Sequence, residues 1–293
     1  MKTNNDFHVY LDETYYSIEE FAEIFDKYNV KNVVFSPPCT KFREPEKSEF
    51  MYSMQRKLLM NNFGYFISKY ISKSFYNKND ELKLFWKLFS GNNDLIKVMK
   101  PDNDYLYNSI KNFDNFKMWF WINPKKNNIR DSNNKIDSYR SKIFGIKFHQ
   151  YWHNFKLENI IDYISLAEQK ELPIYIVLNY QNINDVVKFI EQAKKINIIF
   201  GYGGFPLFNK VWDLINNYSN CYIDLASNHI DNFIIGKIFK KIHFKKILFS
   251  SDCPYNFKDD SGKFNYNMLY TRLKNLPESA VNYILERNFY INK

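Results

Sequence analysis

The chain has 293 residues, of which 45% are hydrophobic and 19% aromatic, and this composition excludes an intrinsically disordered protein. Its three cysteines, Cys39, Cys221 and Cys253, show no CxxC spacing, which excludes a disulfide framework and is typical of a reducing cytosol. The net charge of +9 favours an anionic partner. Because the lysines are spread along the chain without a nucleic-acid-binding motif, we expect no nucleic-acid partner.

The N-terminal stretch MKTNNDFHVY has no apolar signal core, and no apolar run approaches the ~18 residues of a membrane span. We therefore expect a cytoplasmic protein with no membrane partner. The chain shows no linker and no internal repeat, which favours one domain over residues 1–293. Its oligomeric state stays open, and a homo-oligomer is one alternative.

Eight short runs of β-branched and aromatic residues predict strands, and amphipathic stretches between them predict helices. The first helical stretch, SIEEFAEIFDKYN, opens with a capping box formed by Ser17 and Glu20. The predicted strands cover residues 7–11, 32–36, 117–122, 142–148, 173–178, 197–202, 221–226 and 246–251. Later helices are predicted over residues 157–172, 183–196, 207–218 and 278–293.

The spacing of the later strands predicts their direction. Strands four to eight start at residues 142, 173, 197, 221 and 246, so each step is 31, 24, 24 or 25 residues. One strand and one helix fill such a step, which indicates parallel strands. Eight of them predict a closed (β/α)8 TIM-like barrel. The alternative, an open doubly wound sheet, is less favoured because no GxGxxG motif follows any strand.

The interval between strands two and three is too long for a single crossover. We expect a helical insertion there, over about residues 41–113, with helices near 46–72 and 80–98. Barrels carry their sites at the C-terminal ends of the strands. The insertion is therefore expected to lie over those ends.

Polar residues at the predicted strand ends are the candidate site. His8 and Tyr10 alternate on one face of strand one, Lys147 and His149 end strand four, and Asp252 follows strand eight. Each also has a structural explanation. A lone histidine is more often structural, Lys147 fits a rim lysine, and Asp252 fits a turn before proline. Their common position at strand ends is what favours a functional site.

Several segments, taken in order, resemble those of a known family. They are DFHVYLDE, GIKFHQYWHNF, LPIYIVLNY, IIFGYGG, LFSSDCPY and ILERNFYIN. Over nearly the whole chain this pattern is similar to the amidohydrolase-2 branch of the amidohydrolase superfamily. The resemblance implies a TIM barrel and an activity like that of lactone hydrolases and aromatic-acid decarboxylases.

The chain departs from this family at the metal ligands that the resemblance implies. Tyr10, Asn179 and Tyr202 stand where the family has histidines, which leaves His8 and Asp252. Because a catalytic zinc ion takes three protein ligands, we expect no metal cofactor. The alternative is one divalent metal such as zinc at His8 and Asp252, with His149 as a third ligand.

The favoured interpretation is a metal-independent hydrolase or lyase acting on a small anionic, cyclic or aromatic substrate. The resemblance implies catalytic roles for Asp252 as general base, His8 and His149. It implies substrate binding by Lys147, Tyr10, Asn179, Tyr202, His153, Arg43 and Trp152. Two alternatives stay open: a non-catalytic amidohydrolase-like binding or partner protein, and a residual single-metal hydrolase.

Overall fold

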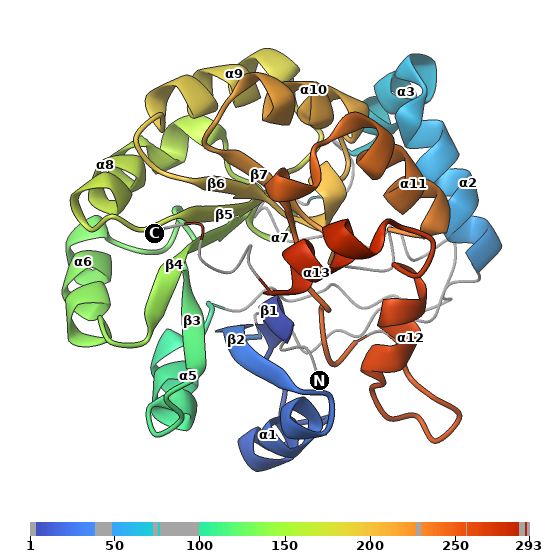
Figure 1. Ribbon diagram of the computed structural model, residues 1–293. Helices are drawn as coiled ribbons and strands as arrows, with labels where there is room; N and C mark the ends of the chain where they lie inside the picture. The colour runs from blue at the N-terminus through green and yellow to red at the C-terminus, as the bar shows by residue number, and fades with distance from the viewer. Residues whose placement is uncertain are drawn as a thin grey trace.

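The computed structural model describes residues 4–38, 49–72, 76, 100–226, 230–255, 257–286 and 291. Its eight parallel strands pair in chain order, with helices around them (Figure 1). This confirms the predicted (β/α)8 barrel. The strands are β1 (Asn4–Tyr10), β2 (Val30–Ser36), β3 (Phe116–Trp121), β4 (Ile143–His149), β5 (Ile174–Val177), β6 (Ile198–Phe200), β7 (Cys221–Asp224) and β8 (Ile247–Leu248).

Backbone hydrogen bonds between β1 and the chain after β8 close the barrel. The amide–carbonyl pairs are Phe7 with Phe249 (3.0 Å), Asp252 with His8 (3.0 Å) and Tyr10 with Cys253 (2.8 Å). The regular pairing of β8 with β7 is therefore shorter than the predicted strand 246–251, because the residues after Leu248 turn to β1. This seam joins the first strand to the segment that follows the last strand.

Helices follow the strands as the sequence predicts. The capping box of the first helix is present: the amide of Glu20 donates to Ser17 Oγ (3.2 Å), and the amide of Ser17 donates to Glu20 Oε2 (2.7 Å). No helix in the described ranges is long and apolar enough to cross a membrane. The helices are α1 (Ile18–Lys27), α2 (Glu49–Met60), α3 (Asn62–Ser72), α5 (Asn103–Ile110), α6 (Ile129–Ser138), α7 (Gln150–His153), α8 (Ile161–Gln169), α9 (Ile183–Gln192), α10 (Asn209–Asn217), α11 (Asn232–Lys241), α12 (Tyr266–Thr271) and α13 (Glu278–Glu286).

Helices α2 and α3 belong to the predicted insertion between β2 and β3. Arg56 on α2 pairs with Asp231 at the N-cap of α11 (2.5 Å), and Tyr65 on α3 donates to the carbonyl of Gln181 after β5 (2.9 Å). The insertion thus reaches the loops at the C-terminal ends of the strands. The further helix predicted near 80–98 lies outside the described residues.

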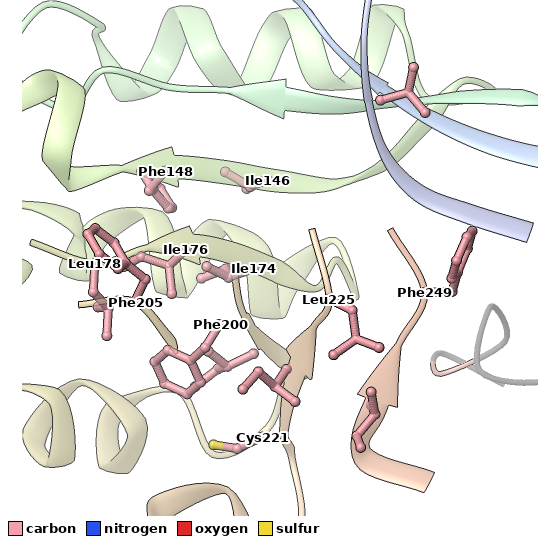
Figure 2. Packing of buried hydrophobic residues seen from close by; sticks show 14 of the residues in the cluster. Ile146, Phe148, Ile174, Ile176, Leu178, Phe200, Phe205, Cys221, Leu225 and Phe249 are labelled. Atoms are coloured by element: carbon pink, nitrogen blue, oxygen red, sulfur yellow. The ribbon is translucent and has the colours of Figure 1, made fainter. Parts of the chain in front are cut away.

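Two apolar layers fix the barrel. The outer layer packs strand residues such as Ile146, Phe148, Ile174 and Ile176 against the helices (Figure 2). The inner layer contains Phe7, Val34, Trp119, Tyr175, Val177, Ile199 and Leu248. Each large side chain buried this way contributes about 1.5–3 kcal/mol, so the inner layer forms a stable base beneath the polar residues at the strand ends.

A bulge in β1 directs its polar residues into the barrel. Asp6 pairs with Val33, and Val9 pairs with Phe35. Between these two pairs, β1 therefore contains one residue more than β2. A bulge re-aims side chains. Phe7 packs in the inner layer, whereas His8 and Tyr10 both contact Lys147 at the next level.

Candidate active site

Lys147 lies at the centre of the polar residues and is fully buried. Its Nζ lies 2.6 Å from His8 Nε2 and donates to Tyr10 OH and Ser36 Oγ, each at 3.0 Å. Nζ also lies over the rings of Trp121 (4.1 Å) and Tyr10 (4.3 Å). Hydrogen-bond acceptors and aromatic faces are both environments that favour a cation.

His8 connects this lysine to Asp252. Its Nδ1 lies 3.3 Å from Asp252 Oδ1, close enough for electrostatic attraction although not aligned as a hydrogen bond. Burial lowers the pKa of His8 well below its usual range, and the charge of Lys147 lowers it further. The imidazole is therefore neutral, and Nε2 faces the amine as an acceptor. Its proton then lies on Nδ1, toward the carboxylate.

A second path joins the same two groups through phenols. Tyr10 OH lies 3.1 Å from Tyr202 OH, and Tyr202 OH donates to Asp252 Oδ1 at 3.4 Å. The contacts from Lys147 through His8, Asp252, Tyr202 and Tyr10 thus form a closed ring. It draws on β1, β4 and the segments after β6 and β8.

The backbone is strained at two members of this ring. Asp252 has a φ of 58° and Tyr202 a φ of 56°, a left-handed conformation that costs a residue with a side chain about 1–3 kcal/mol. The neighbouring turn also needs a glycine, since a Cβ on Gly201 would lie 2.5 Å from Tyr175 OH. Such strain is concentrated at functional sites.

Two further carboxyl groups hold the ring in place. Asp224 at the end of β7 accepts from Tyr175 OH (2.8 Å) and from the amide of Tyr202 (2.6 Å). Burial raises its pKa to about 7, and the charge of Asp252 contributes. Asp6 accepts from the amides of His8 and Ser251, each at 3.1 Å, and burial raises its pKa to about 6. These contacts make both residues anchors of the site.

Beside the ring lies a group of buried side chains with unpartnered nitrogen atoms. Trp121 Nε1, His149 Nε2 and both ring nitrogens of His153 have no hydrogen-bond partner among the described residues. The Trp121 ring centroid is 5.6 Å from those of His149 and His153. His149 Nδ1 accepts from the amide of Trp152 (3.2 Å), so its neutral form carries the proton on Nε2. Trp121 and His149 therefore each offer a buried N–H.

Both histidines of this group are neutral. Burial, followed by the charge of Lys147, holds the pKa of His149 well below its usual range. Burial lowers the pKa of His153 to about 3, with Lys126 as the next cause. The positive charge near these histidines therefore comes from lysines, while both imidazoles are neutral. Neutral N–H donors close to lysine charges are suited to binding an anion.

The structure does not bring every predicted residue to the ring. Asn179 makes its hydrogen bonds outside the ring: its Nδ2 donates to Tyr76 OH (3.1 Å), and its Oδ1 accepts from the amide of Tyr180 (2.7 Å). Trp152 is half-buried and packs over Tyr10 and Trp121 at the mouth. Arg43 lies outside the described residues.

Sequence reasoning missed four residues that shape the site: Ser36, Trp121, Tyr175 and Asp224. Asp224 could have been recognised from the sequence, because it is an ionisable residue within the otherwise apolar run CYIDLA. It follows Tyr222 by two residues, so both side chains lie on the same, inner face of the strand. Ser36 and Trp121 are the last residues of their strands. In a barrel that position alone was sufficient reason to include them.

No protein-family model matches the chain, and no curated protein matches it in sequence. Among solved structures, the chain is similar to a probable 2-pyrone-4,6-dicarboxylic acid hydrolase from Acinetobacter baumannii with citric acid bound. The TM-score is 0.59 at 11% identity, over 98% of this chain and 97% of that chain. The fold is shared. A 2,6-dihydroxybenzoate decarboxylase complexed with 2,6-dihydroxybenzoate gives a TM-score of 0.58 at 11% identity, over 98% of each chain.

A third similar structure is an amidohydrolase from Burkholderia multivorans with bound zinc. Its TM-score is 0.57 at 7% identity, over 97% of this chain and 96% of that chain. The resemblance to amidohydrolases is therefore confirmed as a likeness of fold. At these identities it assigns no role to any residue of this chain.

The donor atoms of the described residues do not fit a metal ion. No group of three histidine, cysteine, aspartate or glutamate residues is placed to hold one within the described ranges. The ring nitrogen of His8 that faces the site centre is already in contact with the Lys147 amine. Tyr202 is a poor ligand as well, because burial raises its pKa well above its usual range and keeps it a neutral phenol.

Proposed function

We propose that the protein is a metal-independent hydrolase or lyase that acts on a small anionic substrate, cyclic or aromatic in character. The observation that carries this proposal is the polarity of the site. One carboxylate at the mouth, Asp252, contacts the buried His8 and Tyr202, and the buried Lys147 lies on the other side of His8. The similar structures support the substrate class, since one is named for a dicarboxylic acid and another holds 2,6-dihydroxybenzoate.

Asp252 is the general base in this proposal. Its side chain is 10% exposed, so it reaches the mouth, while His8 and Tyr202 approach its Oδ1 from inside. A base must lie within hydrogen-bond reach of the proton that it removes. A substrate or water molecule at the mouth would meet that carboxylate first.

The unpartnered N–H groups of Trp121 and His149 provide the anion subsite. A buried donor without an acceptor is unfavourable by about 1–3 kcal/mol, and a carboxylate oxygen would satisfy both. His153 contributes a third polar edge, and Lys147 adds a positive charge 4.1 Å from the Trp121 ring. Trp152 at the mouth offers an apolar wall for a ring.

The chemical step follows from these positions. In hydrolysis, Asp252 takes a proton from water while the water oxygen attacks the substrate carbonyl. The carbonyl electrons move to its oxygen, and the Tyr10 and Tyr202 hydroxyls turn from their partners in the ring to donate to that oxygen. When the intermediate collapses, the leaving oxygen receives the proton from Asp252. In a decarboxylation, the electrons of the breaking carbon–carbon bond move into the conjugated system of the substrate as carbon dioxide leaves. The same phenols stabilise the oxyanion that results, and the carbon then takes a proton from water.

A panel of lactones, cyclic amides and hydroxylated aromatic acids tests the proposal by mass spectrometry of the products. Wild type is expected to convert at least one class without added metal, and Asp252→Asn is expected to lose ~100-fold or more of the rate. Circular dichroism and thermal unfolding show whether the variant keeps its fold. Equal turnover by a folded Asp252→Asn variant would refute the role of Asp252.

The non-catalytic alternative makes a different prediction for the same panel. A binding protein would retain a carboxylated compound in equilibrium dialysis and release it unchanged. Asp252→Asn would then bind as well as wild type, or better, because a negative charge is removed. Binding without product across the whole panel would favour this alternative and end the catalytic proposal.

A further inference from the structure

The contact between Lys147 and His8 raises a question about the charge at the centre of the barrel. A similar structure of this fold holds zinc, whereas the donor atoms here do not fit a metal ion. His8 Nε2, the nitrogen with a lone pair toward the centre, lies 2.6 Å from Lys147 Nζ. An amine that donates to this lone pair and a metal ion that coordinates it exclude each other.

We propose that the Lys147 ammonium supplies the positive charge that a metal ion supplies in metal-dependent enzymes, and that it keeps metal ions off His8. This inference rests on the site described under the proposed function and assigns its source of charge. The cation is then a permanent part of the chain and needs no loading from solution.

The contacts of Lys147 match a charged amine. An ammonium has three N–H donors and no acceptor, and Nζ has three acceptors among the side chains that the structure describes: His8 Nε2, Tyr10 OH and Ser36 Oγ, at 2.6, 3.0 and 3.0 Å. Three aromatic faces also lie within 6 Å, those of Trp121 (4.1 Å), Tyr10 (4.3 Å) and Tyr175 (5.5 Å). The faces of these rings attract a cation.

The charge reaches the mouth along the two paths of the ring. Through His8 it fixes the tautomer, so that the Nδ1 proton faces Asp252. Through Tyr10 it polarises a phenol whose own proton is then directed to Tyr202 or to a substrate oxygen. On each path, the hydrogen-bond donors point from the Lys147 ammonium toward the Asp252 carboxylate. Lys147 thereby acts on the substrate through the groups that it orients, as a positioning residue.

Metal content gives the first test. Protein produced with zinc, manganese or cobalt in the medium and purified without chelator is measured by elemental analysis. Wild type and His8→Ala are expected to carry the same residual metal, well below one equivalent. The matched control is His243→Ala, which removes an exposed histidine at the start of a 3₁₀ turn. A stoichiometric metal that is present in wild type and in His243→Ala but lost in His8→Ala overturns the proposal.

Nuclear magnetic resonance gives the second test, in wild type and without substrate. Histidine and lysine side-chain labelling reports the tautomer of His8 and the charge on Lys147, with His8→Gln and Lys147→Arg used for assignment. The expected result is a His8 ring protonated on Nδ1 only, through the pH range in which histidine ordinarily titrates, together with an ammonium at Lys147. A neutral Lys147 amine at neutral pH, or a His8 ring protonated on Nε2, overturns the proposal.

These tests are independent of turnover. If metal content and the spectra agree with the proposal but no acid is converted, the charge assignment stands and the catalytic proposal fails. If an acid is converted by a protein with a His8-bound metal, the charge assignment fails, and the proposed function keeps its reaction and substrate class but loses its metal independence.

Discussion

The amine of Lys147 lies 2.6 Å from Nε2 of His8, and neither side chain is exposed. Because the Lys147 ammonium is both a hydrogen-bond donor and a cation, the His8 imidazole must accept the hydrogen bond and stay neutral. One contact between β4 and β1 therefore decides the protonation state of the group that faces Asp252. The order of charges from the centre of the barrel outward is cation, neutral ring, carboxylate.

Tyr202→Phe tests the phenolic path. The change removes the hydroxyl that lies between Tyr10 and Asp252 and keeps the ring. We expect kcat to fall roughly 10-fold to 100-fold, because a donor to developing negative charge is lost, with KM little changed. Steady-state kinetics on a converted acid measures it. Tyr70→Phe, on the exposed face of α3, is the matched control and is expected to behave as wild type.

Trp121→Phe and Trp119→Phe form a matched pair on β3. Both rings are fully buried, but Trp119 Nε1 donates to the carbonyl of Phe7 (2.6 Å), whereas Trp121 Nε1 is unpartnered among the described residues. We expect Trp119→Phe to lower the free energy of unfolding by about 1–2 kcal/mol more than Trp121→Phe, because it strands the Phe7 carbonyl.

The same pair tests the anion subsite. Trp121→Phe is expected to weaken the binding of a carboxylated aromatic compound by roughly 10-fold, because a hydrogen bond to a charged group is lost. Trp119→Phe should leave that affinity unchanged. Urea unfolding and calorimetric titration measure the two effects. Equal affinities for Trp121→Phe and wild type would remove Trp121 from the subsite.

The titration of Asp224 should make the free energy of unfolding depend on pH. Its pKa is raised from 3.8 to about 7 in the fold, so between these values the folded state binds the proton more tightly than the unfolded state. The stabilisation from this group is complete below the unfolded pKa and is lost as pH rises through about 7, by up to ~1.4 kcal/mol per pH unit.

Asp224→Asn removes this titration and isolates it from the buried histidines. The free energy of unfolding of wild type minus that of the variant, from urea unfolding at several pH values, is expected to fall between about pH 4 and pH 7 and to level off above. A difference that is constant with pH would show that Asp224 titrates alike in both states.

The ion pair of Arg56 and Asp231 should stabilise the insertion. Arg56 is buried and lies 2.5 Å from Asp231, which also caps α11. Arg56→Met leaves a half-buried carboxylate without this partner, and we expect a loss of about 3 kcal/mol. Lys135→Met breaks a surface pair with Asp104, in which both side chains are around half exposed, and should cost about 1 kcal/mol or less. Thermal and urea unfolding of both variants would separate the two cases.

The barrel was predictable because its signal is repeated. Eight apolar runs separated by helical spacing leave few alternative folds, and each run was found near its predicted place. Strand ends were less predictable. Residues after Leu248 pair with β1, at the opposite end of the sequence, and no local pattern encodes such a partner.

The site was predictable where periodicity decides the direction of a side chain. His8 and Tyr10 were expected on one face and both contact Lys147, even though a bulge intervenes. Asn179 was expected to bind substrate from its place in a family motif, and its hydrogen bond to Tyr76 of the insertion was not predicted. That contact spans about a hundred residues of sequence, so periodicity could not reveal it. The assigned roles stay predictions until turnover is measured.

The seam between β1 and the residues after β8 has a consequence for how the protein is made. His8 and Asp252 stand 244 positions apart, and the hydrogen bond from the Asp252 amide to the His8 carbonyl joins them directly. A nascent chain that has not yet been extended as far as Asp252 therefore lacks the carboxylate. An N-terminal fragment would therefore lack the proposed general base, and docking of the final segment would complete the ring.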